Sequence, residues 1–400
     1  MNILVLTSIY PADDIAATYT PVVHYFAREW VKQGHNVKVF CSFSTFPKVF
    51  YLAARILGVK YLSSKLGYTV MDNAARQKRY HLDGVDVMRS PIYKMLPHGR
   101  FTKRAIVGQS KNVLSYCRES NFKPDVIVGH WLNPQLEIIT ELSKTFPEAR
   151  TALTLHESAQ TLKNLYPRDW RERVAKIDKI GARNHTLRRK LISELNLPIE
   201  RTYLCLSGIP QMFLRDDMGQ KNFNGIKKIA FIGTLFARKY PEAVLKAILK
   251  SGKKDFELIY AGDGERKNAI VEIAQMNGVS DKVKLLGKVS RDVVCKTLED
   301  CDCFVMISRN EVYGLVYLEA MSRGCITIAS KEEGFDGIIR DGENGFLCEA
   351  GNADELANIF GKIGVMSDAT LRQISNAAIS TARQMTDGNC AEAYLNAILE

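Results

Sequence analysis

The sequence alternates short β-branched runs with longer amphipathic runs, and this rhythm starts twice along the chain. The first series of strand-like runs comprises NILVLTS (2–8), NVKVFC (36–41), GVDVM (84–88), DVIVGH (125–130), TALTLH (151–156), DKIGAR (178–183) and TYLCLS (202–207). The second comprises KKIAFIG (227–233), FELIYAG (256–262), KVKLLG (282–287), DCFVMIS (302–308) and CITIAS (325–330). Repeated strand and helix units form a parallel sheet covered by helices. The chain is therefore predicted to be an α/β protein with two Rossmann-like domains.

The two series are separated by a polar, turn-rich segment with little apolar periodicity, SGIPQMFLRDDMGQKNFNG. It predicts a linker and hinge over 209–226, between a first domain at 1–208 and a second at 227–370. Ligands of open α/β sheets bind at the carboxyl ends of the strands, so two facing sheets would place a site in the cleft between them. Residues 45–80 fit neither series and are interpreted as an insertion that projects from the first domain.

Length and composition favour a folded cytoplasmic protein. A chain of 400 residues can build two cores. The first apolar run has no basic region before it and ends at Pro11, so it is interpreted as a strand and not as a signal peptide. No apolar run approaches ~18 residues, which argues against a spanning helix. The nine cysteines show no paired CxxC spacing, as expected for a reducing compartment.

Positive charge is concentrated in the first half of the chain. Residues 1–208 contain 31 Lys and Arg against 17 Asp and Glu, or +14, whereas 209–400 contain 24 against 27, or −3. Either the first domain has a solvated basic surface or it faces an anionic partner, and both interpretations stay open. No nucleic-acid partner is expected.

The basic and aromatic segment 45–80 leads to one specific hypothesis about that partner. Its cations and aromatic rings would dock the first domain on the anionic cytoplasmic leaflet, at the inner face of the plasma membrane. The alternative is that the rings pack against the domain and the lysines are only solvated. The residues concerned are Lys48, Arg55, Lys60, Lys65, Arg76, Lys78 and Arg79, with Phe46, Phe50, Tyr51 and Tyr61.

A cation pair precedes a predicted helix in FIGTLFARKYPEAVLKAIL. Arg238 and Lys239 beside the free amides of a helix N-terminus would form a diphosphate site, whereas the alternative is two solvated side chains in a loop. Gly262 and Gly264 follow a strand directly, but an isolated GxG is typical of a tight turn.

Two histidines each end a predicted strand, His130 in DVIVGH and His156 in TALTLH. Either could contact a polar ligand, or serve as a hydrogen-bonded structural residue. Asp300 and Asp302 form a DxD at the end of a helix and the start of a strand, where capping explains them. No other cluster has metal-ligand spacing, and no metal site is predicted.

The stretch NEVYGLVYLEAMSRG holds two carboxylates around one predicted helix, which would begin near Gly314 and end at Gly324. The first amides of such a helix bind an anion, and Glu311 on the preceding loop could reach hydroxyls beside that anion. Glu319, further along the helix, could accept hydrogen bonds from a diol on the other side. Carboxylates suit sugars because each accepts charge-assisted bonds from two hydroxyls. The pattern therefore predicts a ligand built of sugar, diphosphate and ribose.

This stretch resembles the E-x7-E motif of the retaining group-one glycosyltransferases, the large GT-B family that includes glycogen synthase-like enzymes. The segments GHNVKVF, SGIPQMF, GTLFARK, AGDGERK, LLGKVS and DGENGFL are similar to further family motifs and occur in the family's order. The resemblance covers nearly the whole chain and is greatest to members that build bacterial surface polysaccharides. It implies a GT-B fold, with two Rossmann-like domains facing each other across a cleft and a C-terminal helix at 371–400 that crosses back to the first domain.

The resemblance also implies roles for single residues. Glu311 would hold hydroxyls of the donor sugar, and Arg238 and Lys239 would neutralise the donor diphosphate. His156 would lie against the donor sugar and support the transition state. The remaining implied contacts are Glu319 to the ribose, the amides of Gly314 and Leu315 to the diphosphate, the backbone from Gly287 to Val289 to the base, and Gly262 to the nucleotide.

The chain departs from the family pattern at three places. DDIAATYTP lacks the double glycine of many members, which affects the approach of Thr18–Thr20 to the diphosphate. Thr234 stands where an arginine is often found, which leaves more of the phosphate contact to Arg238 and Lys239. Ser207 replaces the usual asparagine of a turn.

The function implied is transfer of a sugar, with retention of configuration, from a nucleotide diphosphate-sugar to a hydroxyl of a glycan or lipid-linked glycan. A UDP-sugar is expected in preference to a GDP-sugar, with no cofactor and no metal. Two alternatives remain open, a nucleotide-sugar epimerase or hydrolase on the same fold, and a non-catalytic donor-binding partner subunit.

Overall fold

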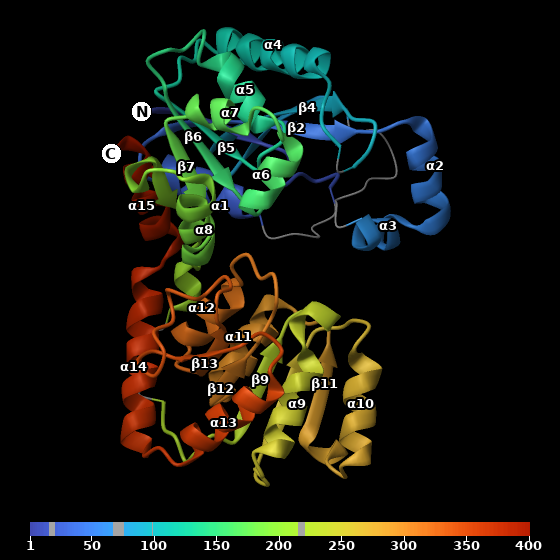
Figure 1. The fold of residues 1–400 in the computed structure, drawn as a ribbon, viewed down its shortest axis with the longest axis vertical. Coiled ribbons are helices and arrows are strands. Elements are labelled where there is room, and N and C mark those ends of the chain that lie inside the picture. The colour runs from blue at the N-terminus through green and yellow to red at the C-terminus, as the bar shows by residue number, and fades with distance from the viewer. Residues whose placement is uncertain (16–20, 67–75, 98, 215–220) are drawn as a thin grey trace. The chain divides into compact units, whose positions relative to one another are not determined.

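The computed structural model describes residues 1–15, 21–66, 76–97, 99–214 and 221–400. The chain divides into two compact units (Figure 1). Unit 1 comprises 1–183, 187–205 and 391–400, and unit 2 comprises 184–186 and 206–390. Each unit has its own parallel sheet and its own hydrophobic core, so both parallel α/β sheets predicted from the sequence are confirmed.

Within the described residues, the sheet of unit 1 has eight strands in the order β3-β4-β2-β1-β5-β6-β7-β8. All neighbours are parallel except β3 and β4. The strands are β1 (Asn2–Thr7), β2 (Asn36–Thr45), β3 (Lys78–Leu82), β4 (Val85–Tyr93), β5 (Val126–His130), β6 (Arg150–Leu155), β7 (Lys179–Ala182) and β8 (Thr202–Leu204). The helices are α1 (Val22–Lys32), α2 (Lys48–Leu57), α3 (Val59–Leu66), α4 (Lys103–Glu119), α5 (Gln135–Leu142), α6 (Ala159–Leu165), α7 (Trp170–Ala175) and α8 (His185–Leu195).

The central strands are continuous apolar runs because helices cover both faces of the sheet. In β1, five of six residues are buried, and all five residues of β5 are buried. This is the pattern expected of a doubly covered parallel sheet, and it is why no alternation of polar and apolar residues marks these strands.

The described sheet of unit 2 has six parallel strands in the order β11-β10-β9-β12-β13-β14. They are β9 (Lys228–Ile232), β10 (Glu257–Ala261), β11 (Val283–Gly287), β12 (Cys303–Val305), β13 (Ile326–Ser330) and β14 (Phe346–Cys348). The helices are α9 (Pro241–Lys250), α10 (Lys267–Met276), α11 (Arg291–Asp300), α12 (Leu315–Ser322), α13 (Ala353–Gly364), α14 (Asp368–Gln384) and α15 (Asp387–Leu399). Residues 391–399 of α15 count with unit 1. Strands β3 and β14 were not predicted, whereas every predicted strand is present.

The predicted linker 209–226 counts with unit 2, and four of its described apolar side chains are buried in the core of that unit, while 215–220 lie outside the described residues. Ile209, Phe213, Phe223 and Ile226 are all buried there. These apolar residues are irregularly spaced, so the sequence shows no helix or strand periodicity that would predict their burial. The predicted boundaries shift accordingly, since unit 2 starts at 206 and extends to 390.

The predicted C-terminal helix is two helices, α14 and α15. Residues 371–390 count with unit 2, and only 391–400 count with unit 1. Trp30 Nε1 donates to the Ala391 carbonyl at 2.8 Å and Arg150 Nε donates to the Ile398 carbonyl at 3.1 Å, which ties the last residues into unit 1.

Residues 45–80 contain α2, α3 and part of β3, with 67–75 outside the described residues. The expectation that Phe46 and Tyr51 insert into a membrane is wrong, because both side chains are buried. The Tyr51 hydroxyl accepts a hydrogen bond from the Phe46 amide at 2.9 Å, and the Phe46 and Phe50 rings lie 4.5 Å apart. These rings fix α2 to the end of β2 instead.

The basic residues of this segment differ in their surroundings. Lys78 pairs with Asp13 and Arg79 with Glu119. The side chains of Lys48, Arg55 and Arg76 are exposed. The side chains of Lys60 and Lys65 lie outside the described part of the structure, as do residues 18–20. Among the helices that the structure describes, none combines the length and apolar composition needed to cross a bilayer.

Candidate functional site

Arg238 and Lys239 lie in the loop between β9 and α9, as predicted. They belong to a short 3-10 turn, Ala237–Lys239, which is followed by Tyr240 in the left-handed conformation at φ 48°. Pro241 then begins α9, where its missing amide is no loss because first-turn amides have no intrahelical partner. The turn therefore presents both cations at the carboxyl end of the β9 strand.

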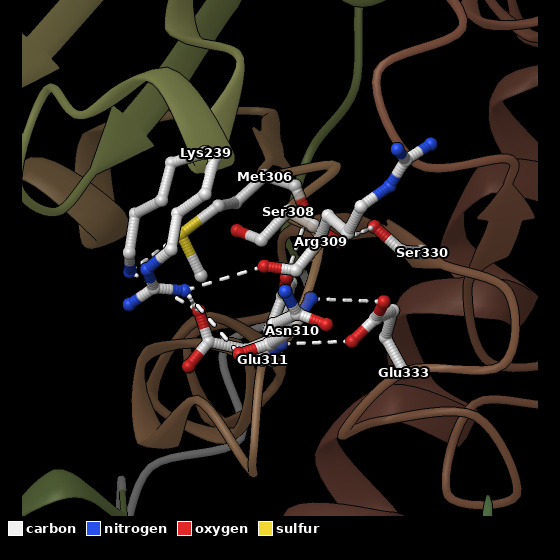
Figure 2. A network of polar contacts seen from close by, with 10 residues as sticks. Lys239, Met306, Ser308, Arg309, Asn310, Glu311, Ser330 and Glu333 are labelled. Carbon is white, nitrogen blue, oxygen red and sulfur yellow. Dashed lines mark hydrogen bonds and ion pairs between the residues drawn. The ribbon is translucent and has the colours of Figure 1, made fainter.

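Glu311 lies on the loop between β12 and α12 and faces these two cations. Figure 2 shows its carboxylate near Lys239. Its Oε2 is 3.2 Å from Lys239 Nζ and 3.5 Å from an Arg238 guanidinium nitrogen. These are ion-pair distances, yet Oε2 is buried and has no hydrogen-bond partner with good geometry. The carboxylate thus keeps an unused acceptor beside two cations, which is the state expected of a group that binds a ligand.

Glu333 positions the loop that carries Glu311, and sequence reasoning missed it. Its two carboxylate oxygens accept hydrogen bonds from the Asn310 amide at 3.0 Å and the Glu311 amide at 2.7 Å (Figure 2). Asn310 is left-handed at φ 54°, so this double bond holds an otherwise unfavourable turn. The signal available in the sequence was its position just after β13, which pairs with β12.

The helix α12 begins at Leu315 and is preceded by Gly314 at φ 82°, which confirms the predicted start. A Cβ at Gly314 would lie 2.5 Å from the Tyr317 ring, so only glycine fits. The first amides of α12 therefore open next to the Glu311 loop. Gly324 follows the helix at φ 73°, which confirms the predicted end.

Glu319 lies on the buried side of α12 and pairs with Arg291 of α11, a partner that the sequence did not reveal. Burial raises the pKa of the Glu319 carboxyl, and the Arg291 guanidinium partly offsets that rise. Contact of Glu319 with the ribose diol of a nucleotide stays a prediction. Such a diol would meet a carboxylate already oriented by Arg291.

The glycines after β9, β10 and β11 let three loops pack backbone against backbone. The Gly262 amide donates to the Gly287 carbonyl at 2.7 Å, and a Cβ at Gly262 would lie 1.9 Å from the Gly233 oxygen. A Cβ at Gly264 would lie 2.6 Å from the Leu235 oxygen. The GxG is therefore explained by close approach of these loops rather than by a turn alone. Nearby, Val289 is partly buried against the core of unit 2.

Asp302 has a structural role at the start of β9, rather than the helix-capping role that the sequence suggested. Its Oδ2 accepts hydrogen bonds from the Lys227 and Lys228 amides, both at 2.8 Å. Across the described ranges, no group of three or more His, Cys, Asp or Glu side chains could hold a metal ion.

In unit 1, His130 and His156 end β5 and follow β6, and their side chains meet. His130 Nδ1 is 3.1 Å from His156 Nε2, and the Trp131 ring stacks on His156 with centroids 4.3 Å apart. The Tyr394 hydroxyl lies 3.3 Å from His130 Nε2 and 2.7 Å from the Thr154 hydroxyl. His130 thus orients His156, and α15 supplies the tyrosine that orients His130.

Both histidines are neutral at neutral pH. Burial, together with the Arg183 charge, lowers the pKa of His130 to about 3. The same two causes and the neighbouring His130 hold the pKa of His156 well below its usual value. Burial raises the pKa of the Glu157 carboxyl, although it accepts hydrogen bonds from the Leu132 and His156 amides.

The structure gathers part of the predicted site in each unit. Unit 2 brings Arg238, Lys239 and Glu311 to the N-terminus of α12 and places Glu319 on that helix. Unit 1 holds His156 beside His130, for which the sequence favours a structural, hydrogen-bonded role over contact with a ligand. Two cations, helix amides and a carboxylate together can bind an anion whose neighbour carries hydroxyls.

The sequence matches a known protein family over residues 215–380, described as "Glycosyl transferases group 1". It is 30% identical over 137 residues to N-acetyl-alpha-D-glucosaminyl L-malate synthase of Bacillus anthracis, covering 34% of this chain and 32% of that protein. It is 30% identical over 235 residues to an uncharacterized glycosyltransferase of Methanocaldococcus jannaschii, covering 58% and 63%. It is 34% identical over 111 residues to the lipopolysaccharide core biosynthesis glycosyltransferase LpsE of Rhizobium meliloti, covering 28% and 32%. The matches thus span from about a third to under two thirds of these relatives.

Solved structures of similar fold cover nearly the whole chain. Anabaena HepE in complex with UDP aligns over 99% of both chains, with a TM-score of 0.66 and 15% identity. The lipopolysaccharide outer core galactosyltransferase WaaB aligns over 100% of this chain and 99% of its own, with a TM-score of 0.67 and 14% identity. At these identities the likeness establishes the fold.

Proposed function

The chain belongs to the group 1 glycosyl transferases and has their GT-B fold, and from this premise we propose that it is a retaining glycosyltransferase. It transfers a sugar from a nucleotide diphosphate-sugar to a hydroxyl of a glycan or lipid-linked glycan in surface polysaccharide synthesis. Relatives named for lipopolysaccharide synthesis, LpsE and WaaB, support the class of acceptor.

One observation carries the proposal, the buried Glu311 oxygen that faces Lys239 and Arg238 without a hydrogen bond. A donor would satisfy all three groups at once. Its diphosphate would take the two cations and the first amides of α12, and its sugar hydroxyls would donate to Glu311.

The chemistry needs stabilisation of the charge that develops as the diphosphate leaves. Lys239, Arg238 and the α12 amides are fixed before the donor arrives, because Glu333 holds the Glu311 loop and Tyr240 and Pro241 fix the cation turn. Preorganised donors of this kind lower the barrier without reorganisation during the reaction. The two cations would neutralise the diphosphate, as a metal ion does in other transferases, so we propose a metal-independent reaction.

His156 supports the sugar as a neutral hydrogen-bonding group. Its lowered pKa keeps the imidazole uncharged, so it does not repel the positive charge of an oxocarbenium-like sugar. We assign Glu319 to the ribose and the backbone near Val289 and Gly262 to the nucleotide. UDP is the expected nucleotide, and HepE in complex with UDP supports this choice.

We place the reaction on the cytoplasmic side, with unit 1 at the inner face of the plasma membrane, because the charge of +14 on residues 1–208 suits an anionic surface. The direct test is release of UDP or GDP from a panel of nucleotide sugars, with and without acceptor glycans. Acceptor-dependent release with an α-linked product from an α-linked donor is the expected result. Stabilisation by a donor in a thermal-shift screen gives an independent readout, since a ligand at ~100 times its Kd adds ~2.7 kcal/mol.

The same assay separates the alternatives. Release that is independent of acceptor indicates a hydrolase, and recovery of an isomerised nucleotide sugar indicates an epimerase. Binding without turnover indicates a non-catalytic partner subunit. Retention of Glu311, Lys239 and Arg238 in one contact group favours the enzyme over that last alternative.

A further inference from the structure

Helix α2 in unit 1 exposes the face that an ordinary surface helix would bury. Val49, Leu52 and Ile56 are spaced three and four residues apart, which places them on one face, and they are 70%, 58% and 74% exposed. The opposite face carries the buried Tyr51 and Ala54. The helix is thus held to the unit by one face while it presents an aliphatic stripe outward.

A second exposed apolar group lies at the end of β4, the strand that pairs with β2. Tyr93 ends β4 and Met95 and Leu96 follow it, and each of the three side chains is more than half exposed. Strand β4 pairs with β2 in parallel, with Tyr93 opposite Thr45, and the Lys94 amide donates to the Thr45 carbonyl at 2.8 Å. Both apolar groups therefore leave the sheet at the same edge, where α2 follows β2 (Figure 1).

Acidic residues are sparse in the two chain segments that carry these groups. No acidic residue occurs between Glu29 and Asp72, or between Asp86 and Glu119. On α2 itself, Lys48 and Arg55 are exposed. At 100° per residue they fall together at one border of the aliphatic stripe, where long side chains can extend toward an anionic plane while their stems contact apolar surface.

We propose that the α2 stripe and residues 93–96 form a docking surface that inserts into the headgroup region of an anionic bilayer. An aliphatic stripe bordered by lysine and arginine, without carboxylates, is the composition of an interfacial helix. A second copy of the chain fits less well, because a few side chains fall far short of the ~1,000 Å² expected of a specific interface. This extends the proposed function by naming the surface that would bring unit 1 to a lipid-linked acceptor.

The test is co-sedimentation of the full chain with vesicles of phosphatidylcholine alone or with phosphatidylglycerol added. Leu52→Gln with Ile56→Gln is compared with a matched pair in unit 2, Met276→Gln with Val365→Gln, which replaces two side chains that are almost fully exposed. Each aliphatic side chain withdrawn from the membrane costs about tenfold in partitioning, so the α2 pair should bind about 100-fold more weakly. The matched pair should bind like the parent chain.

Charge and insertion are then separated. Lys48→Gln with Arg55→Gln should weaken binding to the anionic vesicles by roughly fivefold per cation. High salt should weaken binding as much as the charge variant does. The binding that comes from insertion of the aliphatic stripe should persist at high salt. A thermal melt of each variant without vesicles confirms that the fold is retained.

Three results would overturn the proposal. The first is equal vesicle binding by the Leu52→Gln, Ile56→Gln variant and the parent chain. The second is equal binding to vesicles with and without the anionic lipid. The third is a dimer of the parent chain that the same variant loses in the absence of lipid, which would assign the stripe to a second copy. The vesicle assay contains no nucleotide sugar. A failure here therefore leaves the donor chemistry intact, and a protein that never binds a donor could still pass this test.

Discussion

At the scale of the residue, the contact between Glu311 and Lys239 differs from a structural ion pair in its hydrogen bonding. Their contact is at ion-pair distance, but the Glu311 oxygen is left without a hydrogen bond. Replacing Glu311 or Lys239 by alanine should therefore reduce kcat by ~10²–10³, the usual effect of losing one group that stabilises transition-state charge. Steady-state kinetics with a saturating donor measures this.

Lys246→Ala is the matched control, because Lys246 is exposed on the neighbouring α9. It should retain the parent rate, and urea unfolding should show that all three variants stay folded. Near-normal kcat in both site variants would remove Glu311 and Lys239 from the active site.

His130 gives a prediction about pH. With a folded-state pKa of about 3, it stays neutral where the unfolded chain binds a proton. The unfolded state then binds more protons, so the free energy of unfolding falls as the pH falls below ~6.5. His130 alone accounts for a loss of ~2 kcal/mol between pH 7 and pH 5.

The measurement is urea unfolding of the parent chain and of His130→Gln across this pH range. The variant should lose less stability on acidification, whatever its stability at pH 7, while His156 keeps its own contribution. An unchanged slope would mean that His130 is protonated in the folded chain.

At the scale of the element, the loops after β9 and β10 depend on glycine. Gly262→Ala places a Cβ 1.9 Å from the Gly233 oxygen at φ 148°, so the two loops must separate. We expect a loss of more than about 2 kcal/mol in the free energy of unfolding, because backbone cannot relax as a side chain can. Gly361→Ala is the control, since it lies in α13 with nothing within 4 Å of the new Cβ. It should be neutral or stabilising by ~0.5–1 kcal/mol. Equal effects would show that the loops do not require close approach.

The elements themselves could be read from the sequence where a local pattern marks them. Buried parallel strands are apolar runs, and Gly314 and Gly324 delimit α12 by conformations that other residues resist. What could not be read are contacts between distant positions. Arg291 and Glu319 are 28 residues apart, Glu333 and Glu311 are 22 apart, and Tyr394 and His130 are 264 apart. The choice between membrane insertion and packing for Phe46 and Tyr51 stayed open for the same reason, because periodicity defines a face without saying what covers it.

At the scale of the whole molecule, the cation turn of unit 2 predicts the response to chelators. If Arg238 and Lys239 neutralise the diphosphate, sugar transfer should continue at the parent rate after incubation with EDTA. The assay is acceptor-dependent nucleotide release before and after chelation, with a metal-dependent transferase as the control. Loss of activity, restored by Mg²⁺ or Mn²⁺, would make Asp300 and Asp302 ligands and would contradict this mechanism.

The route of the chain also decides the order in which the protein can be completed. Residues 391–400 belong to unit 1, where the Tyr394 hydroxyl joins Thr154 and His130. A ribosome makes them only after all of 206–390, so unit 2 can close while unit 1 still lacks its last helix. Domains usually fold in order of synthesis, N-terminal first. In this protein unit 1 leaves the ribosome first but is completed last. A nascent chain stalled before Tyr394 would therefore expose the apolar side chains of Trp30 and Tyr203 to chaperones.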